Sequence, residues 1–127
     1  MDNLEYIPGD LVIVKTEPNN HLPKGGVCEF VSYCNRNRVF VRVAKGIDTF
    51  FLEKEQITPI RLTPAILEKN RWHKYQRGYL KDNIYLVYDG VCSWSVEYKE
   101  RFVFFIRHVH QLQHLLFGLN INHEMEV

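Results

Sequence analysis

The first sixty residues show the alternation of apolar and polar side chains that is typical of half-buried β-strands. Val39, Val41 and Val43 alternate with Phe40 and Arg42, and this pattern predicts a strand. Clusters of Gly, Pro and Asn separate it from other β-rich runs. The expected elements are strands over 11–15, 27–33, 39–43, 49–52 and 57–60, a helical turn over 53–56 and a long loop over Thr16–Gly26.

Five short strands, a long first loop and one helical turn before the last strand predict an SH3-like small β-barrel over residues 1–60. Closure into a barrel hides the strand edges that an open sheet of this size leaves exposed. Sixty residues bury only a marginal core. We therefore expect this module to be stabilised by packing against the rest of the chain.

Residues 61–127 predict an antiparallel β-meander with two short helices. The first helix is expected over 62–70, where Thr63 suits the N-cap, Pro64 the first helical position and Asn70 the end. The second is expected over 108–119, where five aliphatic residues fall within one arc of about 120°. Strands are expected over 75–80, 84–88, 92–98 and 101–106, with a final edge strand over 121–127. The predicted fold class is α+β, with modules 1–60 and 61–127.

Composition and charge exclude several classes of protein. The chain has 127 residues, 46% of them hydrophobic and 24% charged, which is typical of a folded domain. The net charge of +1 provides no strong global attraction for nucleic acid or an anionic membrane. No apolar run approaches the roughly 20 residues of a membrane helix, the acidic N-terminus does not resemble a signal peptide, and three cysteines favour reduced thiols over a disulfide framework. These features predict a cytoplasmic protein that does not enter membranes.

Two segments carry a resemblance to a known family. They are Ile57–Asn70 (ITPIRLTPAILEKN) and Ile106–His114 (IRHVHQLQH), which occur together with Gly9-Asp10-Leu11-Val12 near the start. In these features the chain resembles a family of small uncharacterised proteins carried by phages, prophages and related mobile elements of Bacteroides-type bacteria. The resemblance implies an intracellular accessory protein and no particular chemistry. Family members often have Gly-Phe after the Lys-Asn pair, where this chain has Arg71-Trp72.

Histidines near the second expected helix are candidate metal ligands. His110 and His114 have the i, i+4 spacing that places two imidazoles on one helix face, as in zinc sites. On a regular helix His108 lies about 160° from His110, which argues against a three-histidine site, and Gln111 stands where HExxH zinc enzymes have glutamate. The alternative is that both histidines are surface or packing side chains. We expect Phe117, on the same face, to be covered by the barrel or by the C-terminal tail.

Aromatic and basic residues are interleaved between residues 71 and 81. Aromatic rings stack on bases while Lys and Arg contact phosphates, so this pattern favours a nucleic-acid interface. Aromatic residues are also ordinary in strands, and a basic stretch is commonly a solvated face. The candidate nucleic-acid-binding residues are Arg71, Trp72, Lys74, Tyr75, Arg77 and Lys81.

No motif indicates an enzyme: the sequence contains no GxSxG, Walker A or GxGxxG pattern. We therefore predict a non-enzymatic protein-binding or adaptor protein of a phage or mobile element, without a cofactor. Its protein partner would bind the loop Thr16–Gly26 or the aromatic strands. The alternatives are a weak nucleic-acid-binding accessory factor and, third, a metal-dependent enzyme centred on His110 and His114. Whether the two halves share one core stays open.

Overall fold

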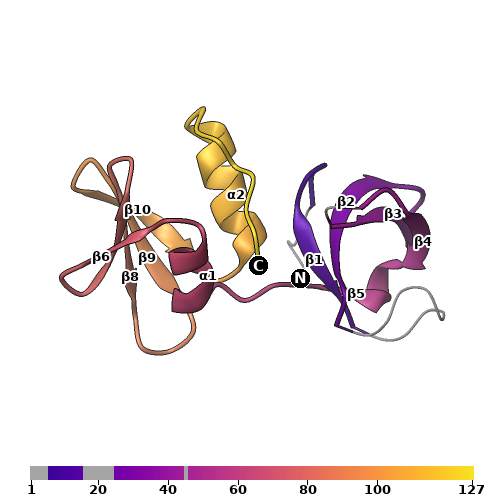
Figure 1. Ribbon diagram of the computed structural model, residues 1–127, viewed down its shortest axis with the longest axis horizontal. Helices are drawn as coiled ribbons and strands as arrows, with labels where there is room; N and C mark the ends of the chain where they lie inside the picture. The colour runs from indigo at the N-terminus through magenta and orange to yellow at the C-terminus, as the bar shows by residue number, and fades with distance from the viewer. Residues whose placement is uncertain (1–5, 16–24, 45) are drawn as a thin grey trace. The chain divides into compact units, whose positions relative to one another are not determined.

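A computed structural model describes residues 6–15, 25–44 and 46–127 (Figure 1). The chain divides into two compact units, Met1–Ile60 and Arg61–Val127. Each unit contains a five-stranded antiparallel sheet, and two short α-helices belong to the second unit. The α+β class expected from the sequence is confirmed.

The first unit forms its strands where the apolar–polar alternation predicts them. In the third strand the alternation buries Val39 and Val41, while Arg38 stays exposed. Most of the expected loop Thr16–Gly26 lies outside the described residues. The elements are β1 (Leu11–Val14), β2 (Val27–Tyr33), β3 (Arg38–Val43), β4 (Thr49–Glu53), the 3₁₀ turn η1 (Lys54–Gln56) and β5 (Ile57–Pro59).

The sheet of the first unit is open, so the expectation of a closed barrel is wrong. Its strand order is β4-β3-β2-β1-β5, and within the described residues no pairing joins β4 to β5. One local feature opposes closure. Strand β5 has only three residues and ends in Pro59, which has no N–H for a further strand.

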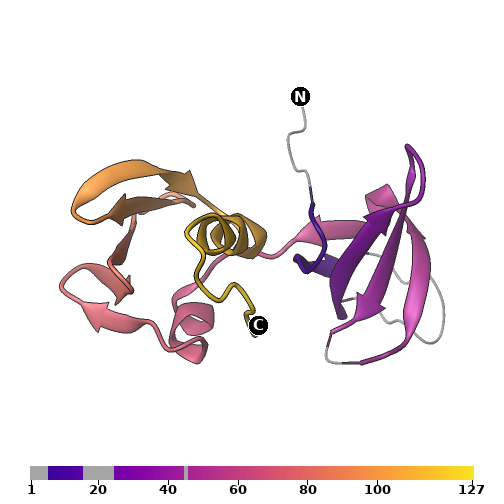
Figure 2. The same ribbon diagram turned by 90° about the horizontal axis from the view of Figure 1, so that it is seen from above.

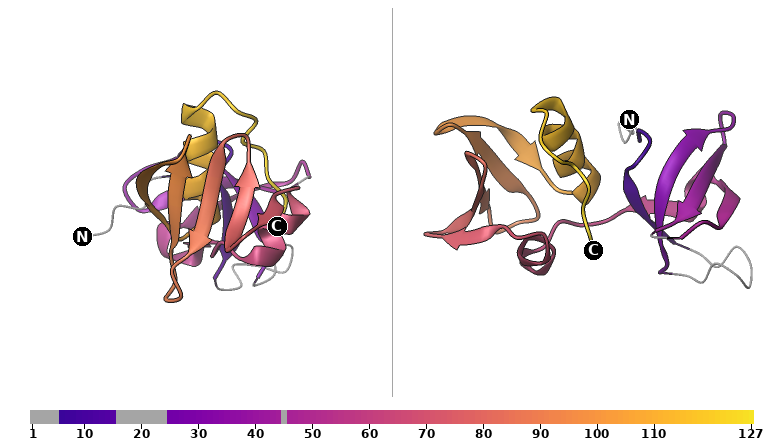
Figure 3. Two further views of the ribbon diagram at one scale, coloured as in Figure 1. Left: turned by 90° about the vertical axis from the view of Figure 1, so that its left-hand side faces the viewer. Right: turned by 45° about the horizontal axis from the view of Figure 1, so that its top comes forward.

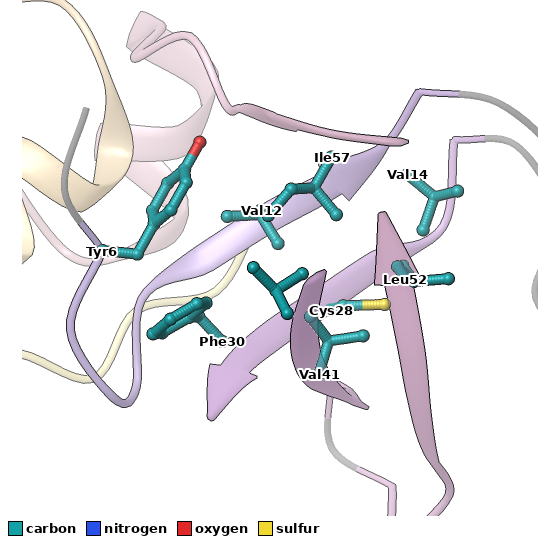
Figure 4. Packing of buried hydrophobic residues seen from close by; sticks show 9 residues of the cluster. Tyr6, Val12, Val14, Cys28, Phe30, Val41, Leu52 and Ile57 are labelled. Atoms are coloured by element: carbon teal, nitrogen blue, oxygen red, sulfur yellow. The ribbon is translucent and has the colours of Figure 1, made fainter. Parts of the chain in front are cut away.

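The core of the first unit lies on one face of this sheet (Figure 4). Phe30 is almost fully buried in it, and its ring lies 5.5 Å from that of Tyr6 and 4.8 Å from that of Tyr33. The buried thiol of Cys28 belongs to the same cluster, and burial raises its pKa to about 11. Cys34 is exposed, and neither thiol is in a disulfide. The other buried members are Val12, Val14, Val39, Val41, Leu52 and Ile57.

The second unit is a meander in which every strand pairs with its neighbours in sequence, in the order β10-β9-β8-β7-β6. The expected strand 75–80 is instead a hairpin, because Gln76 adopts a left-handed φ of 52° and reverses the chain. Both helices lie on one side of this sheet, and the strands lie side by side when it is viewed from the other (Figures 1, 2 and 3). The strands are β6 (His73–Tyr75), β7 (Gly78–Lys81), β8 (Ile84–Tyr88), β9 (Trp94–Tyr98) and β10 (Arg101–Ile106).

The first helix, α1 (Pro64–Lys69), begins and ends at the predicted residues. Thr63 is the N-cap, and its hydroxyl accepts a hydrogen bond from the N–H of Ile66 at 3.3 Å. Pro64 occupies the first turn, and Asn70 is the C-cap. The cap residues of the sequence therefore determine both helix boundaries.

The second helix, α2 (Val109–Gly118), is shorter by one residue at each end than the predicted segment. His108 is its N-cap, with an extended backbone (φ −125°, ψ 155°). The side-chain carbonyl of Gln111 accepts hydrogen bonds from the N–H groups of Arg107 at 2.6 Å and His108 at 3.0 Å. Gln111 thus satisfies two amides at the helix start.

The expected edge strand over 121–127 is absent, and residues after 121 form no helix or strand. Asn70 holds this tail instead. Its side-chain N–H donates to the carbonyl of Glu126 at 2.7 Å, and its side-chain oxygen accepts from the N–H of Glu126 at 2.8 Å. Lys69 donates to the carbonyl of Val127 at 3.0 Å. The prediction of a strand is therefore wrong. The side-chain amide of Asn70 supplies the hydrogen bonds that a neighbouring strand would provide.

Arg71 follows α1 with a left-handed φ of 68°, a conformation that favours glycine. We expect Arg71→Gly to stabilise the second unit by roughly 0.5–1 kcal/mol, because the strain at a non-glycine residue disappears. The midpoint of urea unfolding, followed by tryptophan fluorescence, measures this change. Arg71→Ala is the matched control: it removes the same charge but keeps the Cβ, and a gain equal to that of the glycine variant would contradict the backbone explanation.

Candidate functional site

The structure brings three imidazoles together at the start of α2. The ring of His108 stacks on that of His110, with centroids 5.8 Å apart and planes at 18°. The ring of His114 meets His110 edge-on at 5.5 Å and 81°. The predicted 160° separation of His108 and His110 does not apply, because His108 precedes the helix with an extended backbone. The N-cap residue lies outside the helical backbone conformation, so a helical wheel does not predict where its side chain points.

These rings pack against one another, and no metal site emerges from them. Within residues 6–15, 25–44 and 46–127, no group of three or more His, Cys, Asp or Glu side chains is arranged to hold a metal ion. The neighbouring glutamines bind backbone: Gln111 caps α2, and Gln113 donates to the carbonyl of His123 at 3.3 Å. The ring of His110 is buried and contacts both neighbouring imidazoles.

The buried imidazole of His110 makes stability depend on pH. Burial, with the adjacent imidazoles of His114 and His108, lowers the pKa of His110 to about 4, below its ordinary value of 6.5. Because the unfolded chain then binds a proton more readily than the folded chain, stability falls as pH drops from about 6.5 towards about 4. The loss at the lower end is about 3 kcal/mol, since one pKa unit corresponds to about 1.4 kcal/mol.

The test compares urea midpoints at pH 7 and pH 5 for the native protein and for His110→Gln. We expect the variant to lose less stability between the two pH values, because glutamine does not titrate. An identical pH dependence in the native protein and His110→Gln would show that His110 does not cause the loss of stability at low pH.

The candidate nucleic-acid-binding residues do not form one exposed platform. Trp72 is 4% exposed, so its ring offers no face for a base. Lys81 lies over the Trp72 ring at 6.0 Å and donates to the carbonyl of Asn70 at 3.1 Å. Lys74 lies over the ring of Tyr79 at 5.3 Å. Lys81 is half-buried, whereas Lys74 is exposed.

Part of that set remains on the surface. The ring of Tyr75 is exposed and meets that of Tyr85 edge-on at 5.9 Å. Arg71 precedes strand β6 and Arg77 follows it, and both are exposed. The exposed members of the sequence-predicted interface are therefore Tyr75, Lys74, Arg71 and Arg77.

The largest run of exposed apolar side chains lies on strand β10. Phe102 and Phe105 are each 58% exposed, and their rings meet at 5.2 Å. Val103 and Phe104, between them, are exposed as well. The continuous apolar run of residues 102–106 is a pattern that strands buried on both faces also show, so the sequence alone does not identify it as a surface.

Strand β10 is also an edge strand. It pairs with β9 on one side, and along its other side the described residues provide no neighbouring strand. Of the other edge strands in the described residues, β5 and β6 have three residues each, and β4 has five, with one exposed aromatic side chain, Phe51. Natural proteins seldom leave a long apolar edge uncovered, because its free N–H and C=O groups template pairing with another chain.

An apolar hollow of about 460 Å³ adjoins this edge, between β10 and α2. Alternation along β10 turns Phe104 and Ile106 towards α2, and turns Phe102 and Phe105 to the opposite face of the sheet. The edge therefore offers apolar contacts on both faces together with unpaired backbone groups. The residues that line the hollow are Phe104, Phe105, Ile106, Gln111, His114, Leu115, Gly118 and Leu119.

Phe117 also remains exposed, at 60%, although the ring of His123 meets it at 5.1 Å. The tail thus contacts this side chain without covering it, contrary to the expected burial.

No helix of the described chain is long and apolar enough to cross a membrane. Comparisons with protein-family models, with curated proteins and with solved structures found no match to this chain.

Proposed function

We propose that this is a non-enzymatic protein-binding protein and that strand β10 is its interaction surface. The observation that carries the proposal is an unpaired six-residue edge with four consecutive exposed apolar side chains, Phe102 to Phe105. An extended protein segment added at such an edge gains main-chain hydrogen bonds, and side-chain contacts on both faces supply specificity. Of the two surfaces predicted from the sequence, the loop Thr16–Gly26 and the aromatic strands, the proposal selects one aromatic strand.

The role as an accessory protein of a phage or mobile element belongs to the same proposal. It is supported by the resemblance of Ile57–Asn70 and Ile106–His114 to such proteins. We also propose that the first unit is an SH3-like sheet that stays open between β4 and β5. The strand order β5-β1-β2-β3-β4, with η1 between the last two strands in sequence, supports this description.

The test places a photo-crosslinking phenylalanine at position 105, in the cells that make the protein. Position 117 is the matched control, because Phe117 is equally exposed but lies on α2. We expect adducts with protein from position 105 that disappear when Phe102→Lys is added, since a charge on the same face disfavours strand addition. Equal adducts from both positions, or none from position 105, would overturn the proposal.

A second candidate function, nucleic-acid binding, is favoured by the exposed Tyr75 ring beside Arg77. Phosphate contacts release counterions, so such binding should weaken steeply between about 50 and about 200 mM salt. Titration with short single-stranded RNA and DNA measures it. Arg77→Glu should abolish the binding, whereas Lys99→Glu, in the turn before β10, is the matched control and should leave it unchanged. Absence of binding at the lower salt concentration would remove this candidate.

A further inference from the structure

We propose that the tail, residues 121–127, occupies a second peptide-binding site, and that a partner segment with alternating apolar and acidic residues replaces it there. The tail runs back along α2 and ends beside α1 (Figures 1 and 3). Side chains of both helices and of the α1 C-cap bind its backbone: Lys69, Asn70 and Gln113. We call these three residues the tail site. It includes no residue of β10, so this inference stands apart from the proposed function.

The side-chain amide of Asn70 has the hydrogen-bonding pattern of a strand edge. Its oxygen accepts from the N–H of Glu126, and its nitrogen donates to the carbonyl of Glu126. In an antiparallel ladder, the two residues of a hydrogen-bonded pair exchange the same two bonds. The nitrogen also donates to the carbonyl of Ile66 at 2.7 Å, and Lys81 donates to the backbone carbonyl of Asn70 at 3.1 Å. Contacts with α1 and β7 therefore hold Asn70 ready for a peptide, which lowers the cost of binding one.

The rest of the tail site also binds main chain. Gln113 donates to the carbonyl of His123 at 3.3 Å, and Lys69 donates to the carbonyl of Val127 at 3.0 Å. Any extended segment offers the same backbone groups. Recognition of this kind leaves the choice of sequence to the side chains at alternate positions, as in strand addition.

The contacts that retain the tail are of a kind that a second peptide can replace. No side chain of the tail is buried, although burial of apolar surface is the main stabilising contribution to most protein association. Hydrogen bonds at exposed or half-buried groups each add little net stability, because water competes for them. The half-buried residues are Ile121, His123, Met125 and Val127, and the exposed ones are Asn122, Glu124 and Glu126.

Alternation and charge together define the partner segment. Every second residue of the tail faces the protein, so apolar residues at every second position fit the site. The positions between them carry Glu124 and Glu126. The carboxylate of Glu68 accepts from the hydroxyl of Tyr79 at 2.6 Å, whereas cations gather around Asn70. These cations, which favour the approach of an acidic segment, are Lys69, Arg71 and Lys81.

Peptide exchange on the full chain tests the site. The probe is a fluorescein-labelled, amidated peptide of residues 120–127 (NINHEMEV), and fluorescence anisotropy measures its binding. In the native protein the tethered tail competes at a high effective concentration. Glu126→Pro removes the N–H that Asn70 accepts, so this variant should bind the peptide about tenfold more tightly than the native protein. Glu124→Pro is the matched control and should bind as the native protein does, because the N–H of Glu124 bonds within the tail to Asn122.

Changes in the peptide test how it is recognised. On the Glu126→Pro protein, N-methylation of the peptide at Glu126 should weaken binding about tenfold, because the oxygen of Asn70 loses its donor. N-methylation at Glu124 is the matched control and should have little effect. Lysine in place of both glutamates should weaken binding roughly fivefold, since the charges at this surface site are exposed.

The outcomes distinguish the occupants. Absence of peptide binding to the Glu126→Pro protein at millimolar concentration, or equal losses from N-methylation at the two positions, would overturn the tail site. Exchange of tails between two copies is the alternative occupant. A native protein that dimerises with rising concentration, and a Glu126→Pro variant that does not, would overturn the partner segment. Adducts from position 105 report on β10 alone, so failure of the tail site leaves the proposed function untouched.

Discussion

Gly78→Ala is expected to unfold the second unit at room temperature or to lower its stability by more than about 3 kcal/mol. A Cβ at Gly78 would overlap the carbonyl oxygen of Leu86 and lie 3.0 Å from its carbonyl carbon. Both are backbone atoms of β8, which pairs with β7 through Gly78 and Val87. Because both atoms belong to the backbone, no rotamer change absorbs the added methyl group, and β7 must move away from β8.

Tryptophan fluorescence measures this loss, because both tryptophans, Trp72 and Trp94, are buried in the second unit. Gly118→Ala is the matched control. A Cβ at Gly118, the last residue of α2, meets nothing within 4 Å, and alanine favours helix by up to about 1 kcal/mol over glycine. A native unfolding midpoint for Gly78→Ala would show that β7 and β8 do not approach as closely as described.

Phe30→Ala should have a comparable effect on the first unit. Phe30 is 1% exposed and packs between Tyr6 and Tyr33, so truncation leaves a cavity in the centre of that core. Such substitutions cost about 3–5 kcal/mol, and a unit of this size has little stability to lose. We expect the native amide signals of β1 to β3 to disappear from the NMR spectrum.

The matched control for Phe30→Ala is Phe51→Ala, which makes the same change at a side chain that is 60% exposed. Its ring contacts that of Phe40 at 4.7 Å on the solvent-facing side of the sheet. We expect a loss below about 1 kcal/mol, as is usual for surface substitutions. Equal losses from the two variants would contradict the placement of the core.

The candidate site was only partly foreseeable from the sequence. The segment 101–106 was correctly predicted as a strand, and aromatic strands were named as a binding surface. Its exposure was not predicted, because an apolar run is equally typical of a central, buried strand. Whether a strand is central or at an edge depends on which strands pair with it. The apolar sequence of residues 102–106 does not specify those pairings. Trp72 shows the converse: its basic neighbours suggested exposure, but its ring is buried.

Local signals were sufficient for the secondary structure. Alternation located β3, and the residues Thr63, Pro64 and Asn70 located both ends of α1, because these preferences act over one turn of chain. Contacts distant in sequence decided the rest. The tail depends on Asn70, which lies 56 residues away, and the exposure of β10 depends on its place in the strand order. Both are properties of packing between separated segments, on which local alternation and capping have no influence.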